Sequence, residues 1–348
     1  MIDLTPTTYS IREGELELKT LSLCDHDHWD ELNKNSPAGC FMQSGKWADF
    51  KELEGYQTFR YGIFINEVLL GGCIFYFYPH ESRANILSAP GGPLLPVGFE
   101  KISMKLLTEC ATNLAYNLGA IMFRIEPLWT TKPDYLAQFQ RAPVDLLPSE
   151  TLLIDLSLTE TELLTAMKPK GRYNLRQSYR YGVTTEFTNE PQAISQFYDL
   201  FWQTVKEKQF FGEPYGFFVN LCQTLFPAQI AEIGFAYWQG EILATILVIY
   251  WGQKATYLYG GRRFKYSNVM ASYQLHWTAM QRAKARNCRF YDFYGFSNNP
   301  NHAYAKFSRF KRQFGGFSVE TIGAQDYFFY DHLADIIIPL LQQFSGAN

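Results

Sequence analysis

Two stretches of the chain share one pattern: YGIFINEVLLGGCIFYFY at residues 61–78 and FAYWQGEILATILVIYWG at residues 235–252. Each consists of an apolar run, a short polar turn (INEVL or QGEIL) and a second apolar run, which is the pattern of a β-hairpin. In this alignment Glu67 and Glu241 occupy matching places. The two stretches therefore predict two hairpins at corresponding points of two related units.

The segments that follow the hairpins also match. FEKISMKLLTECATNLAYNLGAIMFRIEP, residues 99–127, has the pattern of an amphipathic helix and then a buried strand. NVMASYQLHWTAMQRAKARNCRFYDFYG, residues 268–295, has the same pattern, and Phe123 corresponds to Tyr291. An internal repeat of this length predicts two copies of one α+β domain, which we place at residues 1–150 and 151–321.

Composition limits the class of protein. With 47% hydrophobic and 19% charged residues, the 348-residue chain can build a complete core. A net charge of -3 argues against a protein that binds nucleic acid over its whole surface, although a local basic patch is allowed. An acidic N-terminal region, an apolar stretch no longer than residues 242–251 and six scattered cysteines favour a cytoplasmic protein with reduced thiols. We also expect a monomer.

One short stretch departs from this acidic balance. AMKPKGRYNLRQSYRYG, residues 166–182, holds five cations, three tyrosines and no acid. Pro169 can begin a helix and Gly182 can end it, which would place Arg172, Arg176 and Arg180 on one face. The face could bind an anion or could be an ordinary solvated helix surface, and the spacing leaves both interpretations open.

The motif search finds no P-loop, dinucleotide fingerprint, G-x-S-x-G or H-E-x-x-H. His26 and His28 in DHDHWD could bind a metal, but a polar segment that caps a helix is the more frequent role of such a stretch. The sequence therefore predicts no metal site and no cofactor.

Four other stretches carry candidate functional side chains. Each could also be structural: a surface lysine, a strand-end ion pair, core tyrosines on one face of a strand, or a solvated helix face. The stretches are FMQSGKWADFK (41–51) with Lys51, FRIEP (123–127) with Glu126, TYLYGG (256–261) with Tyr257 and Tyr259, and HAYAKFSRFKRQFGG (302–316) with Lys306, Arg309, Lys311 and Arg312.

Together and in this order, these stretches resemble the Fem family (FemA, FemB and FemX), aminoacyl-tRNA-dependent peptidyltransferases that build peptidoglycan bridges. APGGPLL (89–95), LLIDLSLTETELLTAMKPKGRYNLRQSYRYGV (152–183) and RFYDFYG (289–295) carry the resemblance further, and it spans roughly residues 41–317. The resemblance implies two GNAT-like acyltransferase domains, with a C-terminal helix within residues 322–348 packing back on the first. Residues 191–230 are too few for the helical arm of long members, so the chain is similar to the arm-less type.

The resemblance also implies a reaction. The aminoacyl group would move from the 3′ ester of aminoacyl-tRNA, a co-substrate rather than a cofactor, to an amine on the stem peptide of a peptidoglycan precursor. The precursor would be a UDP-sugar peptide or lipid II, and the latter would require peripheral membrane association. Aminolysis of an ester needs alignment of two substrates and stabilisation of an oxyanion, and it needs no metal.

Residue roles are implied in the same way. Lys51 matches a lysine that contacts the precursor diphosphate, and Lys311 matches a lysine near the reacting ester. Glu126 matches a carboxylate considered as a general base, with proton transfer assisted by the substrate as the alternative. Tyr257 and Tyr259 match an aromatic strand that lines the acceptor channel. Arg172, Arg176 and Arg180 would then face a polyanion.

The family's second diphosphate-binding residue is missing. KEKQFFGEPYGFF, residues 206–218, has Glu213 and Pro214 where an arginine is expected. Lys206 or Lys208 could replace it, or the acceptor could differ. Tyr215 in the same stretch is a further substrate-binding candidate.

Two other functions stay open. A GNAT-like enzyme could use acyl-CoA or modify another amine, but GGRRFKYSNVMASYQL, residues 260–275, lacks the Q/R-x-x-G-x-G/A spacing of a CoA-binding turn. A binding module without chemistry is also possible, although Lys51, Glu126 and Lys311 argue against it.

Overall fold

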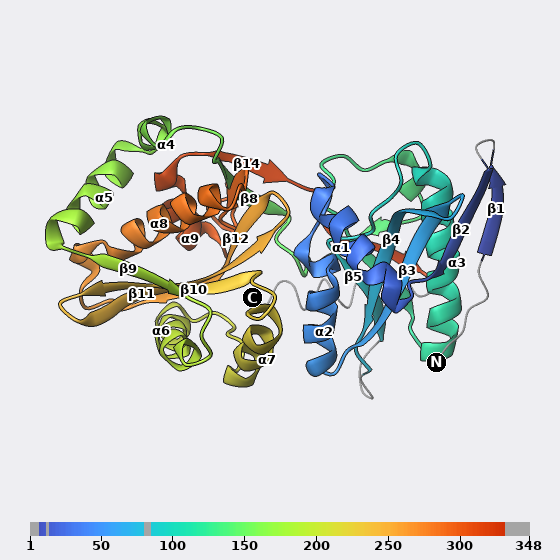
Figure 1. Ribbon diagram of the computed structural model, residues 1–348, viewed down its shortest axis with the longest axis horizontal. Helices are drawn as coiled ribbons and strands as arrows, with labels where there is room; N and C mark the ends of the chain where they lie inside the picture. Colours follow the sequence, from blue (N-terminus) through green and yellow to red (C-terminus); the bar gives the residue numbers. More distant parts are fainter. Residues whose placement is uncertain (1–6, 12–13, 80–84, 331–348) are drawn as a thin grey trace. The chain divides into compact units, whose positions relative to one another are not determined.

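The computed structural model describes residues 7–11, 14–79 and 85–330, and the chain divides into two compact units (Figure 1). The first unit runs to Ser149 and resumes at Glu320, and the second comprises Glu150–Val319. Each unit has its own sheet and its own apolar core. The expected α+β class with two domains is confirmed.

The first unit is built on a sheet of strand order β1-β2-β3-β4-β5-β6-β15-β7. Neighbouring strands are antiparallel except for the parallel pair β5 and β6. Its strands are β1 (Thr7–Ile11), β2 (Gly14–Thr20), β3 (Gln57–Ile65), β4 (Val68–Phe77), β5 (Ile86–Pro90), β6 (Met122–Glu126), β7 (Gln140–Arg141) and β15 (Gln325–Phe328), and its helices are α1 (His26–Asn35), α2 (Gly45–Leu53) and α3 (Glu100–Leu118).

The second unit repeats this plan in a sheet of order β14-β8-β13-β12-β11-β10-β9, in which β12 and β13 form the parallel pair. Figure 1 shows α6 and α7 on one side of the sheet and α4, α5, α8 and α9 on the other. Its strands are β8 (Glu150–Asp155), β9 (Thr184–Thr188), β10 (Ala231–Trp238), β11 (Glu241–Trp251), β12 (Lys254–Arg262), β13 (Phe290–Asp292) and β14 (Phe317–Glu320), and its helices are α4 (Glu160–Ala166), α5 (Pro169–Tyr181), α6 (Ala193–Lys208), α7 (Tyr215–Leu225), α8 (Ala271–Ala285) and α9 (Ala305–Lys311).

The two predicted hairpins are β3–β4 and β10–β11, and each has one extra residue in its second strand, Leu70 of β4 and Leu243 of β11. Ile65 pairs with Val68 and Trp238 pairs with Glu241, so the turn Asn66–Glu67 matches Gln239–Gly240. All four turn residues have positive φ, as tight hairpin turns require. The matching of Glu67 with Glu241 is therefore wrong by one residue, because the turn geometry and not the residue type sets the equivalence.

The helix–strand segments after the hairpins are α3–β6 and α8–β13. Phe123 and Tyr291 are each the second residue of their strand and are fully buried, which confirms their correspondence.

The end of the described chain returns to the first unit as a strand. β15 lies between β6 and β7, with Tyr327 opposite Phe123. The prediction of a helix within residues 322–348 is thus wrong for β15, because the sheet edge beside β6 offers backbone partners that a helix could not use. Residues 331–348, where the rest of that helix was expected, lie outside the described residues.

The segment between β9 and β10 confirms the arm-less type. It holds α6 and α7, joined by a short loop, and α6 and α7 both pack on the core. Within the described ranges, no helix is both long and apolar enough to cross a membrane.

Candidate functional site

The parallel strands of the second unit part from each other after three paired residues. β12 pairs with β13 from Lys254 to Thr256, and the last pair is Thr256 with Asp292. β12 then continues to Arg262, with β11 along its other edge. The segment of β12 that carries Tyr257 and Tyr259 is therefore not paired with β13.

A bulge in β12 sends the two tyrosines to opposite faces of the sheet. Val248 pairs with Tyr257 and Leu247 with Tyr259, so Leu258 is an extra residue on β12. Tyr257 contacts His276 of α8, with ring centroids 4.6 Å apart, whereas Tyr259 packs against Phe201 and other aromatic residues of α6 and α7. The expectation that both tyrosines share one face is wrong, because a bulge breaks the two-residue alternation of a strand.

Lys311 ends α9, and its side chain is buried on the Tyr257 side of the sheet. Its Nζ donates hydrogen bonds to the carbonyl oxygens of Tyr294 at 2.7 Å and Gly295 at 2.5 Å, and it lies 5.8 Å from the centre of the Tyr257 ring. Burial lowers the pKa of Lys311 to about 7, although the nearby Asp292 acts in the opposite direction. Lys311 can therefore exchange a proton near neutral pH.

The turn after β13 presents the two carbonyls to this ammonium. Tyr294 and Gly295 both have positive φ, which is unfavourable for a tyrosine. The Tyr294 N–H donates to Asp292 Oδ1 at 2.7 Å, which holds the turn at its first residue. The unusual backbone thus aims two successive carbonyl oxygens at one Nζ.

His276 completes this buried site and was not identified from the sequence. Its Nδ1 lies 2.8 Å from the Tyr291 hydroxyl, and its ring contacts Phe293, Phe310 and Phe314. Burial lowers the pKa of His276 to about 3, and the charge of Lys311 acts in the same direction, so the imidazole is neutral. A histidine within an apolar helix pattern gives no signal that distinguishes this position from an ordinary core residue.

A pocket of about 1010 Å³ lies in the same unit, between the turn from β12 to α8, the start of α5 and α9. No described Asp or Glu lines it, and its cations form no ion pair with any described residue. Burial lowers the pKa of Arg262, while the charges of Tyr273 and Glu207 act in the opposite direction. The seven cations of this cationic pocket are Lys170, Lys208, Arg262, Arg263, Lys306, Arg309 and Arg312.

The predicted basic helix exists as α5, with Pro169 in its first turn and Gly182 at its end, where φ is 75°. Its residues in the cationic pocket are Lys170 and Asn174, whereas Arg172, Arg176 and Arg180 do not line it. The Arg172 Nη1 donates to the carbonyls of Thr165 and Met167 at the end of α4. The basic stretch therefore supplies residues to the pocket from a different face than the one predicted.

Glu126 lies in the first unit, at the end of β6, and is 3% exposed. Its Oε2 accepts hydrogen bonds from the backbone N–H groups of Leu146 and Leu147, at 2.9 and 2.8 Å. Its Oε1 has no hydrogen-bond partner among the described residues. Burial raises the pKa of Glu126 to about 7, against the N–H groups and the charge of Arg124.

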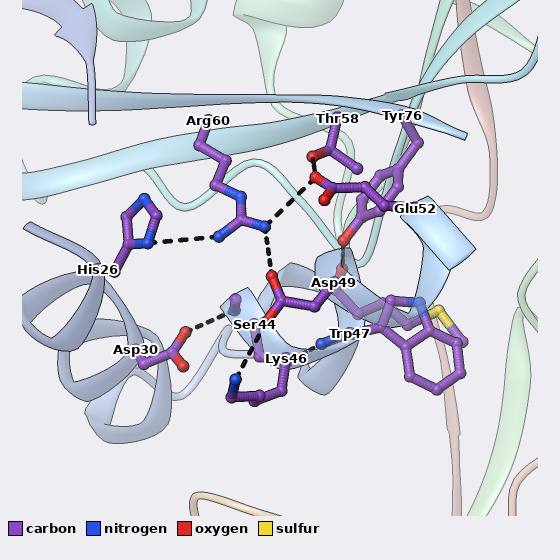
Figure 2. A network of polar contacts seen from close by, with 12 residues as sticks. His26, Asp30, Ser44, Lys46, Trp47, Asp49, Glu52, Thr58, Arg60 and Tyr76 are labelled. Atoms are coloured by element: carbon purple, nitrogen blue, oxygen red, sulfur yellow. Dashed lines mark hydrogen bonds and ion pairs between the residues drawn. The ribbon is translucent and has the colours of Figure 1, made fainter. Parts of the chain in front are cut away.

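Lys51 is on α2, and other residues of that helix take part in a network of polar contacts (Figure 2). Arg60 of β3 donates to Asp49 at 2.7 Å, and the Ser44 hydroxyl caps the helix at the Trp47 N–H. The Lys51 Nζ lies 4.1 Å from the centre of the Tyr56 ring. These contacts fix α2 and hence the position from which Lys51 extends.

The structure groups the predicted residues differently from the sequence. Tyr257 and Lys311 lie together, with His276 beside them, whereas Tyr259 and Tyr215 belong to the aromatic cluster of α6 and α7. Lys51 and Glu126 lie in the other unit. Within the described ranges, no group of His, Cys, Asp and Glu could hold a metal ion.

Known proteins show which family this chain belongs to, and both matches of the family model lie mostly in the second unit. The model of the FemAB family matches residues 134–239 and 228–333. A lipid II:glycine glycyltransferase of Staphylococcus saprophyticus is 20% identical over 397 aligned positions, which cover 92% of this chain and 95% of the relative. A protein of the same name from Staphylococcus haemolyticus is 30% identical over 100 residues, 28% of this chain. The 397 positions exceed the 348 residues here, so the first relative has segments that this chain lacks.

Two solved structures show the fold. The crystal structure of FemX has a TM-score of 0.82 at 18% identity and covers 92% of this chain and 99% of its own. A tandem GNAT protein from the clavulanic acid biosynthesis pathway has a TM-score of 0.55 at 11% identity, covering 90% of this chain and 99% of its own. The expectation of two tandem GNAT-like domains is confirmed.

Proposed function

This chain belongs to the FemAB family of transferases, and we propose that it moves an amino acid from aminoacyl-tRNA to an amine of a peptidoglycan precursor stem peptide. The observation that carries the proposal is the buried Lys311, held by two carbonyls beside a cationic pocket with no acidic residue in its described lining. The curated relatives are named for glycyl transfer to lipid II, which supports a bridge-type acceptor here.

Lys311 has the geometry of an oxyanion donor. An ammonium carries three N–H groups, and the carbonyls of Tyr294 and Gly295 occupy two of them. The remaining N–H can donate to the oxygen that becomes negative when the amine adds to the ester carbonyl. Collapse of this intermediate breaks the bond to the ribose oxygen, and the proton that the amine loses ends on that oxygen. In a dry site such a donor is far more effective than in water.

The cationic pocket suits the phosphates at the 3′ end of a tRNA. Cations around a pocket give affinity for the backbone without reading sequence. Lys306 and Arg309 come from α9, the same short helix that ends in Lys311. Phosphates bound there would contact the same helix that carries Lys311, the residue that we assign to the chemistry.

The remaining residues that match the family keep their proposed roles. Lys51 is assigned to the precursor diphosphate, and Glu126 to accepting a proton from the attacking amine, since its Oε1 is unpartnered among the described residues and its pKa is about 7. Tyr257, Tyr259 and Tyr215 remain assigned to substrate binding, as do Arg172, Arg176 and Arg180. We propose that the protein is a cytoplasmic monomer and uses no cofactor. If the acceptor is lipid II, the protein would associate peripherally with the membrane.

One observation favours a second candidate, an acyltransferase that uses acyl-CoA. The cationic pocket lies at the turn from β12 to α8, and its charge would also suit the diphosphate of CoA. The turn lacks the glycine spacing of CoA-binding GNAT enzymes, which makes this candidate the weaker one.

Transfer of radiolabel distinguishes the candidates. Charged tRNA with a UDP-sugar pentapeptide or lipid II is compared with labelled acetyl-CoA and the same amines. We expect label on the precursor amine from charged tRNA alone. Label from acetyl-CoA alone would overturn the proposal in favour of the second candidate, and no label from either donor, with measurable precursor binding, would indicate a binding module.

A further inference from the structure

The exposed face of α5 is basic and aromatic, and it is separate from the cationic pocket. Arg176 and Arg180 are exposed, and neither has a hydrogen-bond or ion-pair partner among the described residues. Tyr173 and Tyr179 beside them are 58% and 52% exposed. We call these four residues the Arg/Tyr face.

The opposite side of α5 packs on the unit. Gly171, Leu175 and Ser178 are buried there, while Lys170 and Asn174 reach the cationic pocket. The Arg/Tyr face and the pocket are thus two cationic surfaces served by one helix. Burial raises the pKa of the Tyr179 phenol, and the charge of Glu160 on α4 acts in the same direction.

The start of α5 is fixed to the segment that carries Lys311. The Lys168 N–H donates to the Gln313 carbonyl oxygen at 3.0 Å. A Cβ on Gly171 would lie 2.2 Å from that same oxygen, so only glycine permits this approach. The position of the Arg/Tyr face relative to Lys311 is therefore set by direct backbone contact.

We propose that the Arg/Tyr face docks the double-stranded acceptor stem of the tRNA, while the cationic pocket takes its single-stranded 3′ end. The inference rests on the proposed function. The 13-residue helix is about 20 Å long, enough to follow several phosphates of a duplex. Exposed arginines neutralise phosphates, and tyrosine hydroxyls can bond phosphate or ribose oxygens. Fixing α5 to Gln313 would then deliver the 3′ ester to Lys311.

The test uses the double variant Arg176→Gln/Arg180→Gln and two donors. One donor is a charged hairpin that reproduces the acceptor stem and its 3′ end, and the other is a charged short oligonucleotide with the 3′ end alone. The control is Lys101→Gln/Lys105→Gln, two exposed cations four residues apart on α3. Circular dichroism and thermal unfolding check that each variant is folded.

We expect the double variant to bind the hairpin less tightly, and the slope of log K against log salt to fall by about 1.8, for two duplex phosphates. The KM for the charged hairpin should rise by a larger factor than the KM for the short oligonucleotide, and the control should match the wild type with both donors. Equal loss with both donors would assign these arginines to the 3′ end and overturn the inference. Unchanged hairpin binding would show an ordinary solvated face.

Two outcomes separate this inference from the function itself. Binding of the uncharged hairpin that depends on Arg176 and Arg180, without transfer to any amine, would overturn the proposed function and retain the docking surface. If the short donor supports transfer and the double variant binds the hairpin as tightly as the wild type does, the proposed function stands and the docking surface is overturned. Loss of binding to vesicles of anionic lipid, with hairpin binding intact, would make the face a membrane surface and overturn the inference.

Discussion

The two units share a topology but differ where the parallel strands meet. In the first unit β5 and β6 pair along all five residues, from Ile86 with Met122 to Pro90 with Glu126. In the second unit the pairing stops at Thr256 with Asp292, and β12 continues beyond it. The first sheet is thus closed at this point and the second is open. The part of β12 beyond this point carries Tyr257, whose ring lies beside Lys311.

The turn from the parallel strand to the following helix differs as well. In the first unit residues 90–99 read PGGPLLPVGF and contain no cation, whereas residues 260–271 of the second unit contain Arg262, Arg263 and Lys265. The first unit buries an acid, Glu126, and the second buries a base, Lys311, each with a pKa of about 7. The two units therefore share a fold but contain different buried ionisable residues.

The largest expected effect concerns the base. Lys311→Ala should keep the fold and precursor binding but lose about 10²–10³ in kcat, the usual cost of one oxyanion donor. Lys311→Arg should recover only part, because a guanidinium does not reproduce a compact ammonium, and it should abolish any titration near pH 7 in the pH profile of kcat. Steady-state kinetics between pH 6 and pH 9 measure both.

The matched control is Lys306→Ala, because Lys306 lies on the same helix and lines the cationic pocket. It should raise the KM for charged tRNA and leave kcat nearly unchanged. If Lys311→Ala kept a normal kcat and Lys306→Ala were inactive, the chemistry would belong to Lys306 and not to Lys311.

Burial of Glu126 in the first unit should make the free energy of unfolding depend on pH. The pKa of Glu126 is raised from 4.5 to about 7, so the folded state keeps a proton that the unfolded state has lost. The free energy of unfolding should therefore fall as pH rises from about 4.5 to 7, by up to about 3 kcal/mol. Glu126→Gln should remove this fall, measured by urea unfolding at pH 5 and pH 8. A wild-type minus variant difference that does not depend on pH would contradict the burial argument.

The next prediction concerns nucleic-acid binding by the cations at the turn from β12 to α8, which the first unit lacks. Arg262→Gln combined with Arg309→Gln should weaken binding of a single-stranded 3′ end and lower its salt slope by about 1.4, for two single-strand phosphates. Filter binding at several salt concentrations measures this. Lys101→Gln/Lys105→Gln in the first unit again serves as the control, and an equal change there would mean that net charge alone is responsible.

The smallest effect is expected at Lys51. A phosphate contact made equally in the ground state and the transition state changes KM and not kcat. Lys51→Ala should therefore raise the precursor KM several-fold at constant kcat. Lys46→Ala, another lysine of α2 that pairs with Asp49, should change neither. An unaltered KM for Lys51→Ala would remove Lys51 from the site.

Much of the fold follows from the sequence, because local patterns determine it. The hairpins at residues 61–78 and 235–252 combine apolar runs with turn residues, and α5 is bounded by Pro169 and Gly182. The order of motifs from Lys51 to Lys311 was enough to indicate the family. These features depend on residues close together in the chain, where spacing and backbone preference are readable.

Only the tertiary structure decided the site. The bulge at Leu258 places Tyr257 and Tyr259 on opposite faces of the sheet, and the residue types at these positions do not predict a bulge. His276 becomes a neighbour of Tyr257 and Tyr291 through packing between a helix and a sheet. The low pKa of Lys311 comes from burial, and β15 joins the first sheet across 202 residues of chain between Arg124 and Asp326. Such contacts depend on which distant segments meet, and periodicity along one chain carries no record of that.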